Sequence, residues 1–248
     1  MRELDWGFVF KSMPTIFRDG FASTMKLTIV AFICACIIGL LLALVKTYKV
    51  PVLSQIAAVY VSFFRGTPLM VQILVFYYGI PMFLNNMNYK YGWNLNVNEV
   101  PAINFMYLVF SMCYGAYISE VMRSALLSVN KGQMEAGYTV GMNTFMVLRR
   151  IVLPQALVVA LPNLGNYFVD LVKNTSLAFS ATVVELLAAA KILGGNSYKY
   201  FEAYLSVAII YWIICFIFEL LLKAIEKRSR RHESILVICQ ELFEKIFR

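Results

Sequence analysis

The sequence predicts an all-α membrane protein with five transmembrane helices, on the basis of its composition and its long uncharged runs. Of the 248 residues, 60% are hydrophobic and 15% are charged, and the mean hydropathy is +0.71. A soluble domain of this length would need more charge to cover its surface. In lipid, backbone groups must be bonded within helices or a closed barrel, and the uninterrupted apolar runs of this chain select helices.

The first element is a segment at residues 1–24, in which charged residues mix with scattered aromatic residues. It lacks the basic start and apolar core of a cleavable signal peptide, so we expect a retained amphipathic segment at the membrane interface. The first span follows at about residues 25–46. Its core, Leu27–Val45, contains nineteen residues without a charge, which is enough to cross a hydrocarbon layer of about 30 Å.

The next three spans are predicted from similar apolar runs. The second span, residues 54–84, is expected to be one long helix that bends near Gly66 and Pro68. The third span covers about residues 100–122. The fourth, at about residues 151–172, contains prolines, which a transmembrane helix tolerates where neighbouring groups bond the freed carbonyls.

A shorter apolar stretch, Leu177–Ala190, follows the fourth span. Its fourteen residues include Glu185, so it is too short and too charged for an independent span, and we expect a re-entrant or half-crossing helix. The fifth span is residues 202–223. A basic stretch follows, and residues 232–248 place apolar side chains at helical spacing, which predicts an amphipathic C-terminal tail.

Basic residues give the predicted orientation, because Lys and Arg concentrate in cytoplasmic loops. With five spans, the basic clusters next to the spans all fall on one side of the membrane. These are Lys46, Lys49, Arg123, Lys131, Arg149, Arg150, Lys223, Lys227, Arg228, Arg230 and Arg231. We therefore expect the N-terminus outside, the C-terminus in the cytoplasm, and the loop at residues 131–154 in the cytoplasm. Their place beside apolar runs also argues against nucleic-acid binding as the reason for the net charge of +8.

Sequence motifs for catalysis are missing from the chain. It has no phosphate-binding loop of the form G-x-x-x-x-G-K-[ST] and no hydrolase or metalloprotease motif. Four of the five cysteines lie in apolar runs without metal-ligand spacing, so we expect packing residues and neither a disulfide nor a metal site. We therefore predict no catalytic residues, and a transporter built on this chain would need a separate ATPase.

The loop between the third and fourth spans carries the clearest motif. Met134, Tyr138 and Met142 recur at helical spacing, and Gly137 and Gly141 leave part of that segment without side chains. Because an interior glycine costs a helix about 0.5–1 kcal/mol relative to alanine, the pattern favours a docking surface. Spacing alone also allows a surface loop with incidental glycines.

This loop resembles the "EAA" loop of permeases from ATP-binding-cassette (ABC) importers. The matching residues are Glu135-Ala136-Gly137, Gly141 and Ile151-x-Leu153-Pro154, and Gly137 departs from the alanine that is frequent at its position. Other stretches resemble the polar-amino-acid branch of that family, namely Phe64–Leu69, Tyr117–Arg123, Gly132–Ala136 and Lys173–Leu177. The resemblance covers about Gly20–Arg231.

The resemblance implies a type I importer permease in a bacterial inner membrane, which moves polar amino acids, with L-cystine as one candidate, into the cytoplasm. It implies separate ATPase subunits that use ATP and Mg²⁺, and no cofactor bound by this chain. It also implies a second permease chain, identical or different, and an extracytoplasmic amino-acid-binding protein. The predicted ATPase contacts are Met134, Glu135, Ala136, Gly137, Tyr138 and Gly141. Composition and topology alone would also fit an ATP-independent channel or carrier, or a membrane anchor that recruits a partner.

Polar and charged residues within or beside the spans are candidates for a substrate path. An ionisable group at the bilayer centre costs at least ~2.5–3.5 kcal/mol and normally faces protein or a water-filled cavity. The candidates are Arg65, Thr67, Glu120, Lys173, Asn174, Ser176 and Glu185. Arg65 and Glu185 would together bind the carboxylate and the ammonium group of a zwitterionic amino acid.

Two of the charges have an opposite charge three residues away on the same helix face. Glu120 precedes Arg123, and Asp170 precedes Lys173. This spacing favours a structural ion pair over a substrate contact in each case.

Overall fold

The computed structural model describes residues 4–93, 96 and 99–246, and it describes side chains up to Arg228. Its helices are α1 (Trp6–Thr47), α2 (Leu53–Gly66), α3 (Leu69–Tyr91), α4 (Ala102–Ser128), α5 (Lys131–Thr139), α6 (Thr144–Val147), η2 (Leu148–Val152), α7 (Leu153–Asn174), η3 (Thr175–Ala181), α8 (Leu186–Ser197) and α9 (Tyr200–Ile246). The segment η2 is a short π-helical turn and η3 is a 3₁₀ helix. Five helical segments in the described part are long and apolar enough to cross a membrane, which confirms the predicted all-α fold with five spans.

The long helices α1 and α4 pack along each other at the centre of the molecule. Ala31, Ala35 and Ala43 of α1 are fully buried. A Cβ atom on Gly39 of α1 would approach the side chain of Ile118 in α4 to 2.6 Å. Small residues at four-residue spacing thus bring the two backbones together, which is how helices associate in lipid without a hydrophobic driving force. The helices α2, α3 and α7 pack against α4 of this pair.

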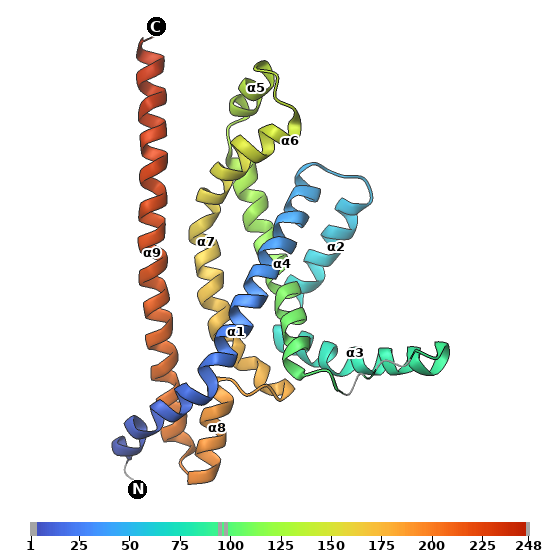
Figure 1. Cartoon of the computed structure of the whole chain (residues 1–248), viewed down its shortest axis with the longest axis vertical. Coiled ribbons are helices and arrows are strands. Elements are labelled where there is room, and N and C mark those ends of the chain that lie inside the picture. The colour runs from blue at the N-terminus through green and yellow to red at the C-terminus, as the bar shows by residue number, and fades with distance from the viewer. Residues whose placement is uncertain (1–3, 94–95, 97–98, 247–248) are drawn as a thin grey trace.

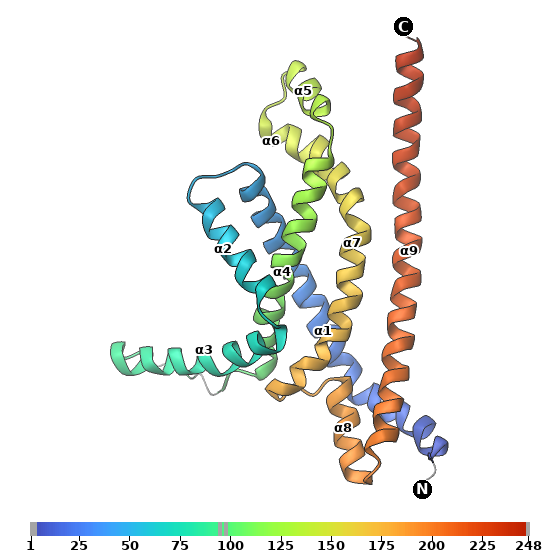
Figure 2. The same cartoon turned by 180° about the vertical axis from the view of Figure 1, so that it is seen from behind.

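The N-terminus and the C-terminal end of the chain lie at opposite ends of the molecule. The turn between α1 and α2, α5, α6 and the C-terminal end of α9 lie toward one end, whereas the N-terminus and α8 lie at the other (Figure 1). Figure 2 shows the same arrangement from behind. The basic clusters at the end of α1 and around α5 and α6 therefore share one end, as the five-span topology requires. The assignment of that end to the cytoplasm stays a prediction.

The segment expected at the membrane interface, residues 1–24, is not a separate element, because its described helical part is the first half of α1. This half packs on α8 and α9, and the hydroxyls of Ser12 and Ser206 lie 2.8 Å apart. Lys199 donates a hydrogen bond of 2.5 Å to Asp5, and this bond holds the pKa of Asp5 below its usual value. One of the charges that suggested an interfacial segment thus ties α1 to the turn before α9. Contact of the outer face of α1 with the membrane interface stays a prediction.

The second expected span is two helices instead of one bent helix. α2 ends at Gly66, the next two residues, Thr67 and Pro68, are extended, and α3 begins at Leu69. Pro68 has no N–H group for a helical bond to the carbonyl of Phe64, and its ring disfavours a helical conformation at the residue before it. α3 then runs across the direction of α4 and α9 (Figure 1).

The stretch after the fourth span also differs from the single half-crossing helix that we expected. η3 ends at Ala181, and Thr182 adopts a left-handed conformation with φ of 61°. The chain then stays non-helical until α8 begins at Leu186. The stretch is therefore two short helices joined by a turn.

The C-terminal tail is helical in the part that the structure describes. Residues 232–246 continue α9 without a break. The predicted apolar stripe on residues 232–248 lies on side chains outside the described ones, so it stays a prediction.

The contact between α1 and α8 gives a test of this packing. A Cβ atom on Gly20 would lie 2.5 Å from the Cα atom of Leu186, so we expect Gly20→Ala to lower the free energy of unfolding by about 1–3 kcal/mol through overpacking. The control is Gly79→Ala in α3, where nothing lies within 4 Å of the added atom and alanine should be neutral or slightly stabilising. Unfolding of the purified chain in a denaturing detergent measures both, and equal stability of the two variants would contradict the packing.

Candidate functional site

The loop between α4 and α7 folds back on itself through its glycines, so that α5 packs on α6 and η2. Gly137 in α5 is buried, and a Cβ atom there would lie 2.9 Å from Val147 and 3.0 Å from Ile151. Gly141 has φ of 81°, in the left-handed region that favours glycine. One glycine permits close packing and the other permits the turn after α5. Both glycines therefore serve the fold of the loop itself, which disfavours the interpretation of a surface loop with incidental glycines.

The side chains that this loop exposes differ from the predicted row. Met134 and Met142 pack against the core, whereas Tyr138 is 46% exposed. Val140 and Phe145 are exposed as well, at 73% and 67%. Among the other predicted contacts, the exposed residues are Glu135, Ala136 and Gly141. We refer to Tyr138, Val140 and Phe145 as the loop patch.

A polar cluster lies between α4 and α7. The Tyr114 hydroxyl donates to Asp170 Oδ2 at 2.8 Å and accepts from Asn174 Nδ2 at 2.8 Å. Asn174 also donates to Asp170 at 3.0 Å. The rings of Tyr114, Tyr117 and Tyr167 have centroids 5.8 to 6.4 Å apart. We refer to these three rings as the tyrosine cluster.

Arg65, in the last turn of α2, reaches the same cluster. Its guanidinium carbon lies 5.8 Å from the centroid of the Tyr117 ring, which is a cation–π geometry. Arg65 and Asp170 therefore both contact the tyrosine cluster, one through a ring face and the other through a hydroxyl. The predicted candidate Thr67 is near Arg65 in the chain, but its hydroxyl donates to the Phe63 carbonyl of α2 and accepts from Gln72 of α3.

A groove of about 570 Å³ runs between α7 and α9 beside this cluster. Its charged lining residues are Asp170, Lys173, Glu219, Lys223 and Glu226. Lys173 is exposed, and the described residues contain no ion pair between it and Asp170, so the predicted pair is wrong. The Asp170 carboxylate is instead bonded by Tyr114 and Asn174. The candidate Ser176 donates to the Lys173 carbonyl at the end of α7.

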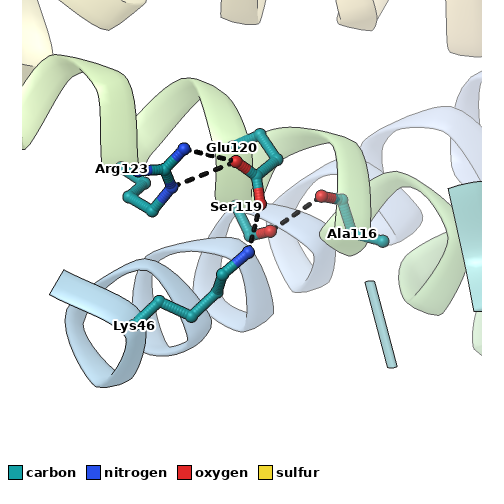
Figure 3. Close-up of polar contacts among 5 residues, drawn as sticks. All are labelled: Lys46, Ala116, Ser119, Glu120 and Arg123. Carbon is teal, nitrogen blue, oxygen red and sulfur yellow. Dashed lines mark hydrogen bonds and ion pairs between the residues drawn. The ribbon is translucent and has the colours of Figure 1, made fainter. Parts of the chain in front are cut away.

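Glu120 in α4 is bonded by two cations (Figure 3). Arg123 places two nitrogens 3.0 Å from Oε2, and Lys46 at the end of α1 donates to Oε1. The Lys46, Glu120 and Arg123 side chains are 19%, 22% and 38% exposed. The predicted Glu120–Arg123 ion pair is confirmed. Lys46, which the sequence did not connect with this pair, joins α1 to α4.

Glu185 lies in the interior and not in an open cavity beside Arg65. It is fully buried. Its carboxylate accepts from the backbone N–H groups of Leu187 and Ala188 at 2.7 and 2.8 Å and from the Tyr211 hydroxyl at 2.8 Å. These are the contacts of an N-cap residue for α8. The geometry thus favours a structural role and does not pair Glu185 with Arg65.

Sequence reasoning missed Asp170 and the tyrosine cluster as site residues. Asp170 was assigned to an ion pair, and the three tyrosines were not distinguished among the fifteen in the chain. The i, i+4 spacing of Asp170 and Asn174 is a signal that could have found Asp170, because it puts an acid and an amide on one helix face. The tyrosine cluster depends on contacts between α4 and α7 and has no such signal.

Five apolar helices, a folded polar loop and opposite charges beside a cluster of tyrosines between the helices are the features of a helical membrane transport subunit. Residues 35–231 match the model of the family described as binding-protein-dependent transport system inner membrane component. The chain belongs to this family, and it is a permease subunit.

Known proteins of the family resemble this chain over nearly its whole length. It is similar to the probable amino-acid permease protein YxeN of Bacillus subtilis (strain 168), with 40% identity over 92% of this chain and 96% of the relative. It is also similar to the L-cystine transport system permease protein TcyB of the same organism, with 40% identity over 92% and 93% of the two chains. A crystal structure of an amino acid ABC transporter with histidines matches with a TM-score of 0.75 and 30% identity, over 92% of this chain and 100% of that chain.

These findings confirm the family and the importer-permease fold that the loop motif predicted. The chain is a multi-pass protein of the bacterial inner membrane. It is not itself the ATPase, which in ABC importers is a separate subunit.

The ion pairs of Glu120 predict a loss of stability when its charge is removed. Glu120→Gln leaves Lys46 and Arg123 without their anion, and we expect the free energy of unfolding to fall by about 1–3 kcal/mol, between the values for exposed and buried pairs. The control is Asp19→Asn, which breaks the more exposed Arg18–Asp19 pair and should change stability by less than about 0.5 kcal/mol. Detergent unfolding of both purified variants checks this, and equal losses would show that the Glu120 pairs hold α1 and α4 no better than a surface contact.

Proposed function

We propose that this permease moves polar amino acids into the cytoplasm and that Arg65, Asp170 and the tyrosine cluster form its substrate path. The observation that carries the proposal is that a cation and a carboxylate contact the same tyrosine cluster. A free amino acid carries an α-carboxylate and an α-ammonium group, which need a pair of this kind. The named relatives support this substrate class, and TcyB makes L-cystine a candidate.

Each residue of the path has a distinct part in this proposal. Arg65 binds the substrate carboxylate, and Asp170 binds the ammonium group. Asn174 and Tyr114 hold the Asp170 carboxylate in place through their hydrogen bonds. Lys173, exposed in the neighbouring groove, offers a second cation to the carboxylate as the substrate moves along the groove.

The loop patch is the proposed docking surface for the ATPase subunit. Exposed aromatic and apolar side chains on a polar loop are typical of protein contacts. ATP and Mg²⁺ are used in that partner subunit. With the ATPase bound at the loop patch, the proposed orientation has the loop and the C-terminus in the cytoplasm and the N-terminus outside, and the basic clusters support it.

Two further partners complete the proposed importer. Five spans are few for a closed path, so a second permease chain, identical or different, supplies the other side. An extracytoplasmic binding protein delivers the amino acid. Family membership argues against the two alternatives, an ATP-independent channel or carrier and a membrane anchor without transport.

The docking proposal is tested by ATPase binding. Tyr138→Ala and Phe145→Ala remove exposed side chains of the loop patch, and we expect each to weaken binding of the ATPase subunit roughly tenfold or more. The control is Tyr89→Ala, a 92% exposed tyrosine in α3, which projects away from α5 (Figure 1). Binding is measured between purified subunits in lipid discs. Unchanged affinity of both loop variants for the ATPase subunit would contradict the docking role.

The substrate path is tested by uptake kinetics. Arg65→Met and Asp170→Asn each remove a charged hydrogen-bonding group, so we expect KM for uptake to rise about tenfold to a hundredfold. Glu185→Gln should instead lower thermal stability and leave KM near its normal value, because Glu185 caps α8. Reconstituted vesicles with ATPase and binding protein give the rates, and size-exclusion chromatography checks assembly. Normal KM in both charge variants would remove these residues from the path.

A further inference from the structure

The break between α2 and α3 sets the direction of α3. The buried residues of α3 are Gln72 and Ile73, both near its start. The far end of the helix projects away from the other helices (Figure 2). The direction of α3 therefore depends on the contacts that fix its first turns.

Gln72 bonds the chain on the other side of this break. Its Nε2 atom donates to the Phe64 carbonyl at 2.9 Å, to the Thr67 carbonyl at 3.0 Å and to the Thr67 hydroxyl at 2.8 Å. Gln72 is 2% exposed, so solvent does not compete for these bonds. Two N–H groups are thus shared among three acceptors, all within the end of α2 and the break.

The acceptor at Phe64 shows which bond Gln72 replaces. In a continuous helix, the N–H group of residue 68 would donate to the carbonyl of residue 64. Pro68 has no N–H group, so this carbonyl would be left unpaired in an apolar region, where an unmet backbone group is costly. Gln72 reaches back and bonds it with a side chain.

Thr67 determines which end of the Gln72 amide faces the break. The Thr67 hydroxyl donates its proton to the Phe63 carbonyl at 2.9 Å, so its oxygen can only accept from Gln72. In the described part of the chain, Gln72 Oε1 has no hydrogen-bond partner. The NH₂ group of the Gln72 amide therefore makes these three hydrogen bonds across the break. We refer to Phe64, Thr67, Pro68 and Gln72 as the joint.

We infer that Gln72 is a positioning residue. It supplies the hydrogen bond that Pro68 cannot make, and it thereby fixes the direction of α3 and the last turn of α2, which carries Arg65. The consequence for Arg65 rests on the proposed substrate path, whereas the direction of α3 does not.

Distances between two spin labels test the joint directly. Val59 on α2 and Tyr89 on α3 are 71% and 92% exposed, so both accept a label as cysteine in a full-length chain whose five native cysteines are replaced by alanine. Dilution with unlabelled chain ensures that only distances within one copy are read. We expect a narrow distribution for the otherwise unchanged chain in lipid discs.

Three variants separate the missing bond from general packing. Gln72→Met keeps the length of the side chain and removes both donors, so it should broaden the Val59–Tyr89 distribution. Pro68→Ala alone should leave it unchanged, because Gln72 still holds the joint. The double variant, Pro68→Ala with Gln72→Met, regains an N–H group for the Phe64 carbonyl. Its distances between positions 59 and 89 should therefore shift toward ~45 Å, the length of a straight helix over 30 residue steps.

The matched control is Gln55→Met, an exposed glutamine at the start of α2, which should not change the distribution. A narrow and unmoved distribution in Gln72→Met would overturn the inference. A double variant that behaves like Gln72→Met would overturn it too, because the bond lost at Pro68 would then not be the one that Gln72 supplies.

Uptake kinetics test the role of Gln72 in the joint independently of the proposed substrate path. We expect Gln72→Met to raise KM roughly tenfold through a displaced Arg65. If Arg65→Met leaves KM unchanged while Gln72→Met broadens the distances, the substrate path fails and the joint stands. If Arg65→Met raises KM and Gln72→Met does not, the positioning of Arg65 by Gln72 is refuted.

Discussion

Lipid offers no hydrogen bonds to a peptide backbone, so a helix that stops within an apolar stretch needs side chains to bond its freed N–H and C=O groups. In the described part of the chain, two breaks within apolar stretches meet this constraint. Gln72 bonds the carbonyls freed at the end of α2. At the start of α8, Glu185 and the Thr24 hydroxyl bond three successive N–H groups. Buried polar side chains at these breaks are therefore part of the backbone's hydrogen bonding.

The same constraint separates the remaining charges into two groups. Glu120 has its charge balanced by Lys46 and Arg123, so it offers little attraction to a substrate. Asp170 is bonded by neutral groups, and among the described residues it has no ion pair. A partly buried carboxylate that is hydrogen-bonded but not neutralised attracts a cation, and an amino acid supplies one in its ammonium group. This contrast is the physical reason for placing Asp170, and not Glu120, in the proposed substrate path.

Sequence reasoning succeeded where the signal is local and failed where it depends on distant contacts. The all-α fold with five spans and the family of the loop motif follow from composition and spacing, and both were confirmed. The expected second span is instead two helices, because Pro68 breaks it. Lys46 and Glu120 are 74 positions apart, and no periodicity within one helix could have joined them. Met142 was expected on the same helix face as Met134, but α5 ends at Thr139 and the turn that follows brings Met142 back to the core. Glu is not among the residues preferred at N-caps, so the type of residue at position 185 did not predict that Glu185 caps α8.

The loop patch and the proposed substrate path are joined by one continuous helical segment. Gly137 packs against Val147 and Ile151, and η2 continues into α7, which carries Asp170 near its far end. From Leu153 to Asp170 the helix extends ~26 Å at 1.5 Å per residue. A helix is stiff along its axis, whereas the π-helical turn of η2 interrupts the regular ladder and allows a bend. In the proposed importer, a force on the loop reaches Asp170 through η2 and α7, whereas Arg65 lies against Tyr117 of α4. The hydrogen bond from Tyr114 of α4 to Asp170 opposes a change in the distance between Asp170 and Arg65. In the proposed importer, the distance between Asp170 and Arg65 is thus the quantity on which a docked ATPase would act through α7.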